Sequence, residues 1–136
     1  MTSSPQLFHA LADRTRLRIV NLLARGSLCV CDIQRILEQP QSSVSRHLAL
    51  LKSTGLIVDR RDGMRTFYAL AASDSRLRRA VIGAIRAHLA VDDEYRTDLD
   101  ELLRLRARGD CHEEPKGRGT AAQRSRGGRA ERRMGA

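Results

Sequence analysis

The chain has 136 residues, which suits one compact domain with appended segments and is too short for two full domains. With two Phe, two Tyr and no Trp, its core must be built from Leu, Ile, Val and Ala. That composition favours packed helices and predicts a mainly α fold. The formal net charge of +9 suits a polyanionic partner such as nucleic acid.

The positive charge is concentrated near the end of the chain. Residues 115–136 hold seven basic residues and one acidic residue, whereas residues 1–114 hold eighteen and fifteen. The Gly- and Arg-rich composition predicts a disordered basic tail over 111–136, after a folded domain over 1–110. No stretch approaches the ~20 apolar residues of a membrane span, and the start lacks an apolar signal region. We therefore expect a cytoplasmic protein with no membrane partner and reduced thiols.

Apolar residues three to four positions apart predict six helices, and Gly or Pro ends the second, third and fourth of them. Asp62-Gly63, between two strand-like runs, predicts a two-stranded β-hairpin. The predicted helices cover 6–12, 13–25, 30–38, 41–53, 74–89 and 93–108, and the strands cover 56–61 and 66–70. Short helices followed by a hairpin wing predict a winged helix-turn-helix.

The fourth predicted helix combines an apolar stripe with a face of short polar and cationic side chains. Hydroxyls and free amides at a helix start favour phosphates and base edges. Arginines on a neighbouring hairpin can contact the DNA backbone or the minor groove. The serines could instead be helix caps, and the histidine a packing residue. We predict a DNA-binding surface of Gln41, Ser42, Ser43, Ser45, Arg46, His47, Arg60, Arg61 and Arg65.

Cys29 and Cys31 stand at the start of the third predicted helix. Helix N-termini lower the pKa of a thiol, so this position predicts thiolates that bind a soft ion. Positions i and i+2 do not share a helix face, so one ion bound by both sulfurs would distort the first turn. Such a distortion would couple ion binding to DNA binding. The alternative is two small buried apolar residues.

Three segments together resemble the ArsR/SmtB family of metal-responsive repressors. They are residues 7–17 (LFHALADRTRL), 28–32 (LCVCD) and 43–48 (SVSRHL), with Leu51-Lys52 and Gly55-Leu56 following. The resemblance covers about residues 5–90. It implies a homodimer formed through the first and fifth helices, operator binding by the fourth helix and the wing, and release of double-stranded operator DNA on metal binding. Arsenic-, antimony-, cadmium- and lead-sensing members carry the Cys-Val-Cys of this chain.

Departures from the family patterns concern the third ligand. Gln34 stands where arsenic sensors of the resembled pattern have a further cysteine, and no cysteine lies earlier in the chain for a cadmium-type site. The third thiol, Cys111, is either a ligand or a stray exposed group. Because a trivalent metalloid forms three bonds to sulfur, we predict arsenite or antimonite as inducer and no organic cofactor. Cadmium, lead or zinc are alternatives, zinc with His112 or Glu113 joining the thiols. The predicted ligands are Cys29, Cys31 and Cys111.

The first and fifth predicted helices each carry an apolar face that a single small domain cannot fully cover, so we expect a second copy of the chain to cover both. The histidine on the fifth predicted helix lacks the paired acidic and histidine ligands of a zinc- or nickel-type site, so we assign it to packing. The predicted dimer interface consists of Leu7, Phe8, Leu11, Val81, Ile85, His88 and Leu89.

Two other functions remain to be separated from metal sensing. The cysteine pair could be a redox switch, with oxidation altering DNA binding. An enzyme with a cysteine nucleophile would need a paired base, and the sequence offers neither that nor a phosphate loop or metalloprotease motif. We therefore predict that the protein is not an enzyme.

Overall fold

The computed structural model describes residues 3–114, so residues 115–136 of the predicted tail lie outside the described part. The described part folds into six α-helices, one short 3-10 helix and three strands. The elements are α1 (Ser4–Leu11), α2 (Arg14–Leu23), β1 (Leu28–Cys29), α3 (Val30–Leu37), α4 (Gln41–Ser53), β2 (Ile57–Asp62), β3 (Arg65–Leu70), α5 (Arg76–His88), η1 (Leu89–Val91) and α6 (Asp93–Arg108).

The mainly α winged helix-turn-helix is confirmed. Only residues 38–40 separate α3 from α4, and the tight turn is made by Glu38 in the left-handed region, with φ 52°. The β2–β3 hairpin reverses at Gly63, whose φ of 61° suits a glycine. The Asp13 carboxylate caps α2 by accepting the backbone N–H of Arg16 at 3.0 Å.

Two local features differ from what the sequence indicates. Leu28 and Cys29 form an additional strand that pairs with Tyr68 and Phe67 of β3, so the sheet is three-stranded and antiparallel, in the order β1-β3-β2. A two-residue strand has no periodicity to detect. The serines at the start of α4 also do not cap it, since Pro40 occupies the N-cap position without a side-chain hydrogen bond.

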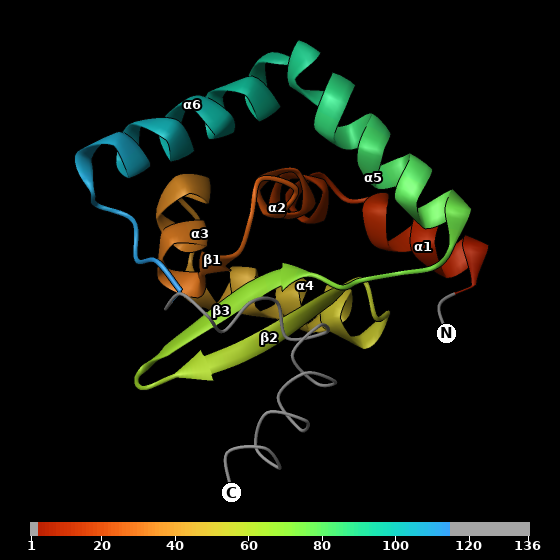
Figure 1. The fold of residues 1–136 in the computed structure, drawn as a ribbon, viewed down its shortest axis with the longest axis horizontal. Helices are drawn as coiled ribbons and strands as arrows, with labels where there is room; N and C mark the ends of the chain where they lie inside the picture. Colours follow the sequence, from red (N-terminus) through yellow and green to blue (C-terminus); the bar gives the residue numbers. More distant parts are fainter. Residues whose placement is uncertain (1–2, 115–136) are drawn as a thin grey trace, which may run out of the picture.

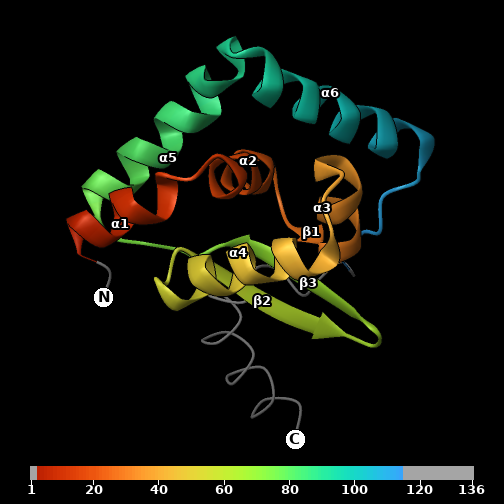
Figure 2. The same ribbon diagram turned by 180° about the vertical axis from the view of Figure 1, so that it is seen from behind.

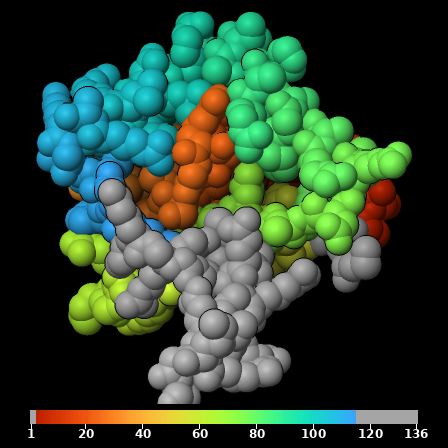
Figure 3. Space-filling model, in the orientation of Figure 1, coloured from red at the N-terminus to blue at the C-terminus, as the bar shows by residue number. Residues whose placement is uncertain are grey.

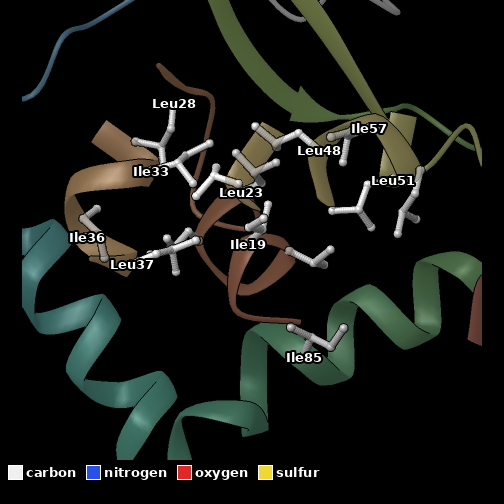
Figure 4. Close-up of a cluster of buried hydrophobic side chains, with 14 of the residues drawn as sticks. Ile19, Leu23, Leu28, Ile33, Ile36, Leu37, Leu48, Leu51, Ile57 and Ile85 are labelled. Atoms are coloured by element: carbon white, nitrogen blue, oxygen red, sulfur yellow. The ribbon is translucent and has the colours of Figure 1, made fainter. Parts of the chain in front are cut away.

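The core surrounds α2, which lies between the α5–α6 pair on one side and α4 with the sheet on the other (Figures 1 and 2). Ile19 of α2 is fully buried among Ile33 of α3, Leu48 of α4 and Ile57 of β2 (Figure 4). Each such side chain contributes about 1.5–3 kcal/mol through removal from water. This core holds α3 and α4 against the sheet and leaves the outer face of α4 exposed.

The C-terminal arm, α5 to α6, bends at η1 and returns over α2 and α3 (Figures 1 and 2). The space-filling view shows α5 and α6 covering much of one face of the domain (Figure 3). The Arg18 guanidinium of α2 holds the Asp98 carboxylate of α6 through two hydrogen bonds of 2.8 Å. Gly109, with φ 74°, ends α6, and the following residues reach the start of α3. No helix within residues 3–114 is both long and apolar enough to span a membrane.

Candidate functional site

The outer face of α4 is exposed as predicted. Gln41, Ser42, Ser45 and Arg46 are all exposed, while the apolar stripe of the same helix is buried in the core. Figures 1 and 2 place α4 on the side of the domain opposite the bend between α5 and α6. The helix therefore offers hydroxyl, amide and guanidinium groups to a partner without disturbing the core.

Two predicted residues of α4 are less available. The Ser43 hydroxyl is half-buried and donates to Gln39 Oε1 at 3.4 Å. His47 Nδ1 lies 3.4 Å from Arg16 Nη1 and 3.6 Å from Asp13 Oδ2. These contacts join α4 to the start of α2, and a role for the half-buried His47 in DNA binding stays a prediction.

The predicted wing arginines surround the hairpin turn. Arg61 on β2 and Arg65 on β3 are exposed, and Arg60 is half-buried. Lys52 at the end of α4 forms an ion pair of 3.0 Å with Asp59 of β2, which the sequence analysis missed. This pair joins the wing to α4. We give the name α4–wing surface to the predicted DNA-binding residues of the two elements other than His47; it comprises Gln41, Ser42, Ser43, Ser45, Arg46, Arg60, Arg61 and Arg65.

The second candidate site joins the start of α3 to the C-terminal end of the described chain. The Sγ atoms of Cys29 and Cys31 and an imidazole nitrogen of His112 all lie within 4.8 Å of one another. We call these three residues the Cys–His cluster. Cys29 is 1% exposed, and the other two are half-buried. His112 Nδ1 lies 3.2 Å from the Cys31 sulfur.

The expectation that the first turn of α3 must distort to bring the sulfurs together is wrong. Cys29 lies in β1 and is the N-cap of α3, with an extended backbone of φ −67° and ψ 144°. Only Cys31 lies within the helix. Because the two cysteines belong to different elements, the i, i+2 restriction of a helix does not apply to them.

Asp32 holds His112 at the cluster. Its carboxylate is fully buried and accepts the backbone N–H of His112 at 2.8 Å. His112 Nδ1 lies 3.3 Å from the other carboxylate oxygen, and Arg35 Nη2 lies 3.6 Å from that same oxygen. From the sequence, His112 was expected only as an alternative zinc ligand, and Asp32 was not singled out. The available signal was an aspartate directly after the cysteine pair.

The expected lowering of thiol pKa values at the helix start is wrong for Cys31. Burial raises the pKa of Cys31 to about 11, with the Cys29 sulfur and the Asp32 carboxylate adding to the effect. The Asp32 backbone N–H opposes the rise but does not outweigh it. Burial and Asp32 also raise the pKa of Cys111.

Cys111 is not part of the Cys–His cluster. It is half-buried and packs against the hydrophobic core. This placement differs from the expectation of an exposed thiol in a tail, since residues 111–114 lie in the described part and contact α3 through His112. A role for Cys111 as an ion ligand stays a prediction.

The predicted dimer residues fall into three groups. Leu7 and Ile85 are buried in the chain's own core, so they offer little side chain to a partner. Phe8 is 51% exposed, and His88 is also exposed. Leu77 of α5, 41% exposed, was not predicted. The remaining predicted residues, Leu11, Val81 and Leu89, are half-buried.

A winged helix-turn-helix with an exposed polar face on its second helix defines a class of DNA-binding regulators. Within that class, residues 13–58 match the family described as "Bacterial regulatory protein, arsR family". An uncharacterized HTH-type transcriptional regulator of Methanocaldococcus jannaschii is 40% identical over 77 residues, which cover 56% of this chain and 84% of that protein. The chain belongs to the arsR family.

Two further proteins are similar to this chain. The "Arsenical resistance operon repressor" of Escherichia coli K12 is 54% identical over 67 residues, which are 48% of this chain and 57% of the relative. The solved homodimeric winged helix-turn-helix DNA-binding domain Mb0332 of Mycobacterium bovis is 34% identical, with a TM-score of 0.53 over 65% of this chain and 83% of that domain. The chain spans little more than half the length of the first arsenic-related relatives it matches.

Proposed function

We propose that this protein is a homodimeric DNA-binding repressor that releases its operator when arsenite or antimonite binds the thiolates of Cys29 and Cys31. One observation carries the proposal. Cys29 pairs with Phe67 in the wing strand β3, while Cys31 lies in α3, the first helix of the helix-turn-helix. An ion that joins the two sulfurs therefore acts on both elements that position the α4–wing surface.

The α4–wing surface supports the DNA-binding part of the proposal. Ser42, Ser45 and Arg46 are exposed on the helix that follows the helix-turn-helix turn. In this motif the second helix enters the major groove, where a guanidinium can contact guanine through two hydrogen bonds. The exposed Arg61 and Arg65 then lie where a wing meets the phosphate backbone.

The homodimer is supported by apolar side chains on α1 and α5. Phe8 is 51% exposed and Leu77 is 41% exposed, and Figure 1 shows α1 beside α5. Exposed apolar side chains on neighbouring helices are typical of a subunit interface. The similar Mycobacterium bovis domain is homodimeric. Light scattering at micromolar concentration tests the oligomeric state, and a monomer with and without DNA would contradict it.

The inducer is proposed from the chemistry of the thiols. Sulfur ligands select soft ions over magnesium, calcium or manganese. The Escherichia coli relative is named a repressor of an arsenical resistance operon, which favours arsenite or antimonite. On binding, each thiol sulfur replaces one hydroxyl group of the trivalent metalloid: a sulfur–metalloid bond forms, a metalloid–oxygen bond breaks, and the thiol proton leaves with that hydroxyl as water. Moving β1 against α3 then lowers operator affinity by about 1–3 kcal/mol, a typical allosteric coupling.

An operator duplex selected by the protein from a random pool provides the test. We expect arsenite to release the wild-type protein, followed by fluorescence anisotropy, and Cys29→Ser or Cys31→Ser to bind the duplex normally but fail to release it. Release of both variants at the wild-type arsenite concentration would contradict the sensing role. Metal-free release by peroxide that dithiothreitol reverses would instead identify a redox switch.

A further inference from the structure

The third donor of the Cys–His cluster is an imidazole, not a thiol. We propose that His112 completes, with Cys29 and Cys31, a binding site for a divalent ion of the zinc class, and that Asp32 positions His112 for it. This inference rests on the proposed role of the two cysteines as ion ligands. Divalent ions of the zinc class would then be a second class of inducer beside arsenite. Their binding would need His112 of the C-terminal segment, whereas arsenite binding needs only the sulfurs.

The distances support a shared ligand position. Both sulfurs and the imidazole nitrogen lie within 4.8 Å of one another, and His112 Nδ1 is 3.2 Å from the Cys31 sulfur. Zinc binds sulfur at about 2.3 Å and imidazole nitrogen at about 2.0–2.1 Å, so donors around one zinc are about 3.5–4 Å apart. Two atoms that lie this close in the ion-free protein can therefore share a cation after a small adjustment. Cys111 is not part of this group.

Asp32 gives the imidazole a fixed place before any ion binds. A fully buried carboxylate is costly unless it is paired, and this one accepts the backbone N–H of His112 and lies close to its ring. Because Nδ1 is also the atom that faces Cys31, Asp32 positions His112 for an ion through the backbone hydrogen bond rather than through the ring. The pair of Arg18 and Asp98 holds α6, the helix that precedes this segment, against α2.

The donor set selects the ion. Two thiolates and one neutral imidazole suit Zn²⁺ or Cd²⁺ and leave a fourth position for solvent. Binding balances as two protons leave the cysteine thiols for solvent and two sulfur–metal bonds form. The two negative sulfurs then neutralise the divalent charge in a half-buried setting. Trivalent arsenic prefers sulfur and gains little from the imidazole.

Titration of the full chain with Co²⁺, a spectroscopic substitute for zinc, tests the donor set directly. We expect sulfur-to-cobalt charge-transfer bands and the visible bands of a tetrahedral site with two sulfurs and nitrogen. His112→Ala should weaken Zn²⁺ binding, measured by competition with a chelator, by about a hundredfold and change the visible bands. Asp32→Asn should weaken it by about tenfold or more. Arsenite binding should change less than about threefold in both variants.

Two matched variants complete the design. His88→Ala removes an exposed histidine on α5, and Cys111→Ser removes the competing third donor; both should bind Zn²⁺ like the wild type. The inference is overturned if Cys111→Ser rather than His112→Ala alters the cobalt bands. It is also overturned if His112→Ala weakens arsenite and Zn²⁺ equally, because His112 would then only hold the segment in place. In both cases loss of arsenite binding in Cys29→Ser would leave the proposed function standing.

Discussion

The α4–wing surface and the Cys–His cluster are built in opposite ways. The surface consists of mostly exposed side chains that all come from residues 41–65, on elements joined by a short connection and the Lys52–Asp59 pair. The cluster is half-buried or buried, and it joins residues 29–32 to His112 about 80 positions later. The first depends on local structure, whereas the second depends on the path of the entire C-terminal arm.

This difference predicts that the DNA-binding part and the ion-binding part respond to different substitutions. Substitutions on the α4–wing surface should alter DNA binding without affecting the fold, because those side chains make few internal contacts. The cluster should instead respond to changes far from its ligands, because α6 brings His112 to α3.

Asp98→Ala should lower the free energy of unfolding by about 3 kcal/mol, the largest effect we expect. Asp98 is 3% exposed, and its loss leaves the Arg18 guanidinium, whose side chain is 14% exposed, without its carboxylate partner. Urea unfolding of the ion-free protein measures the change. Asp100→Ala, an exposed position on the same helix, is the charge-matched control and should change stability by less than about 0.5 kcal/mol. Equal stability of both variants would mean that the arm is not anchored there.

Cys31 should react slowly with an alkylating reagent in the ion-free protein. A pKa raised from 9.0 to about 11 by burial and by the Cys29 sulfur lowers the thiolate fraction near pH 8 about a hundredfold. The neutral thiol is the favoured form, so the rate should keep rising between pH 9 and 11 instead of levelling off near 9. Iodoacetamide labelling at Cys31, followed by fragment mass spectrometry and compared with the urea-unfolded chain, measures this. Equal rates in both states would contradict the buried setting.

Local features of the sequence explain which parts of the fold were predictable. The spacing of Val44, Leu48 and Leu51 indicated the buried stripe of α4, and Asp62-Gly63 indicated the hairpin. Both signals lie within a few residues of the structure they specify. The exposed face of α4 followed directly from the opposite side of that stripe.

The parts that were missed depend on contacts distant in sequence. Strand β1 exists because Leu28 and Cys29 pair with Tyr68 and Phe67, and no pattern within two residues can indicate this. The high pKa of Cys31 likewise results from the fold around it, since a helix start alone lowers a thiol pKa. His112 reaches the cluster only because η1 reverses the arm after α5. The sequence therefore showed which side chains can bind an ion, but not which other residues the fold places around them.

Arg46→Ala should weaken operator binding by about 1–3 kcal/mol while leaving stability unchanged. Arg46 is exposed on the outer face of α4, where a guanidinium contacts a base edge or a phosphate. Loss of a base contact lowers affinity for the operator more than for random DNA, whereas loss of a phosphate contact lowers both and flattens the salt dependence. Arg104→Ala on α6 removes the same charge from the other side of the domain and should bind DNA like the wild type. An unchanged affinity and salt slope for Arg46→Ala would remove this residue from the proposed surface.

Truncation after Glu114 should have the smallest effect, about 1 kcal/mol or less at 0.15 M salt, where exposed charges are screened. The removed residues 115–136 carry seven basic residues and one acidic residue, and such a composition contacts phosphates without sequence information. Affinity for the operator and for random duplex should therefore fall by similar factors, and the dependence on salt should become flatter. Fluorescence anisotropy with both duplexes at several salt concentrations measures the two affinities. A selective loss of operator binding would assign base recognition to the tail, and the α4–wing surface would then not account for specificity alone. Retained release by arsenite in the truncated protein would further localise sensing to residues 1–114, because that part holds all three cysteines and His112.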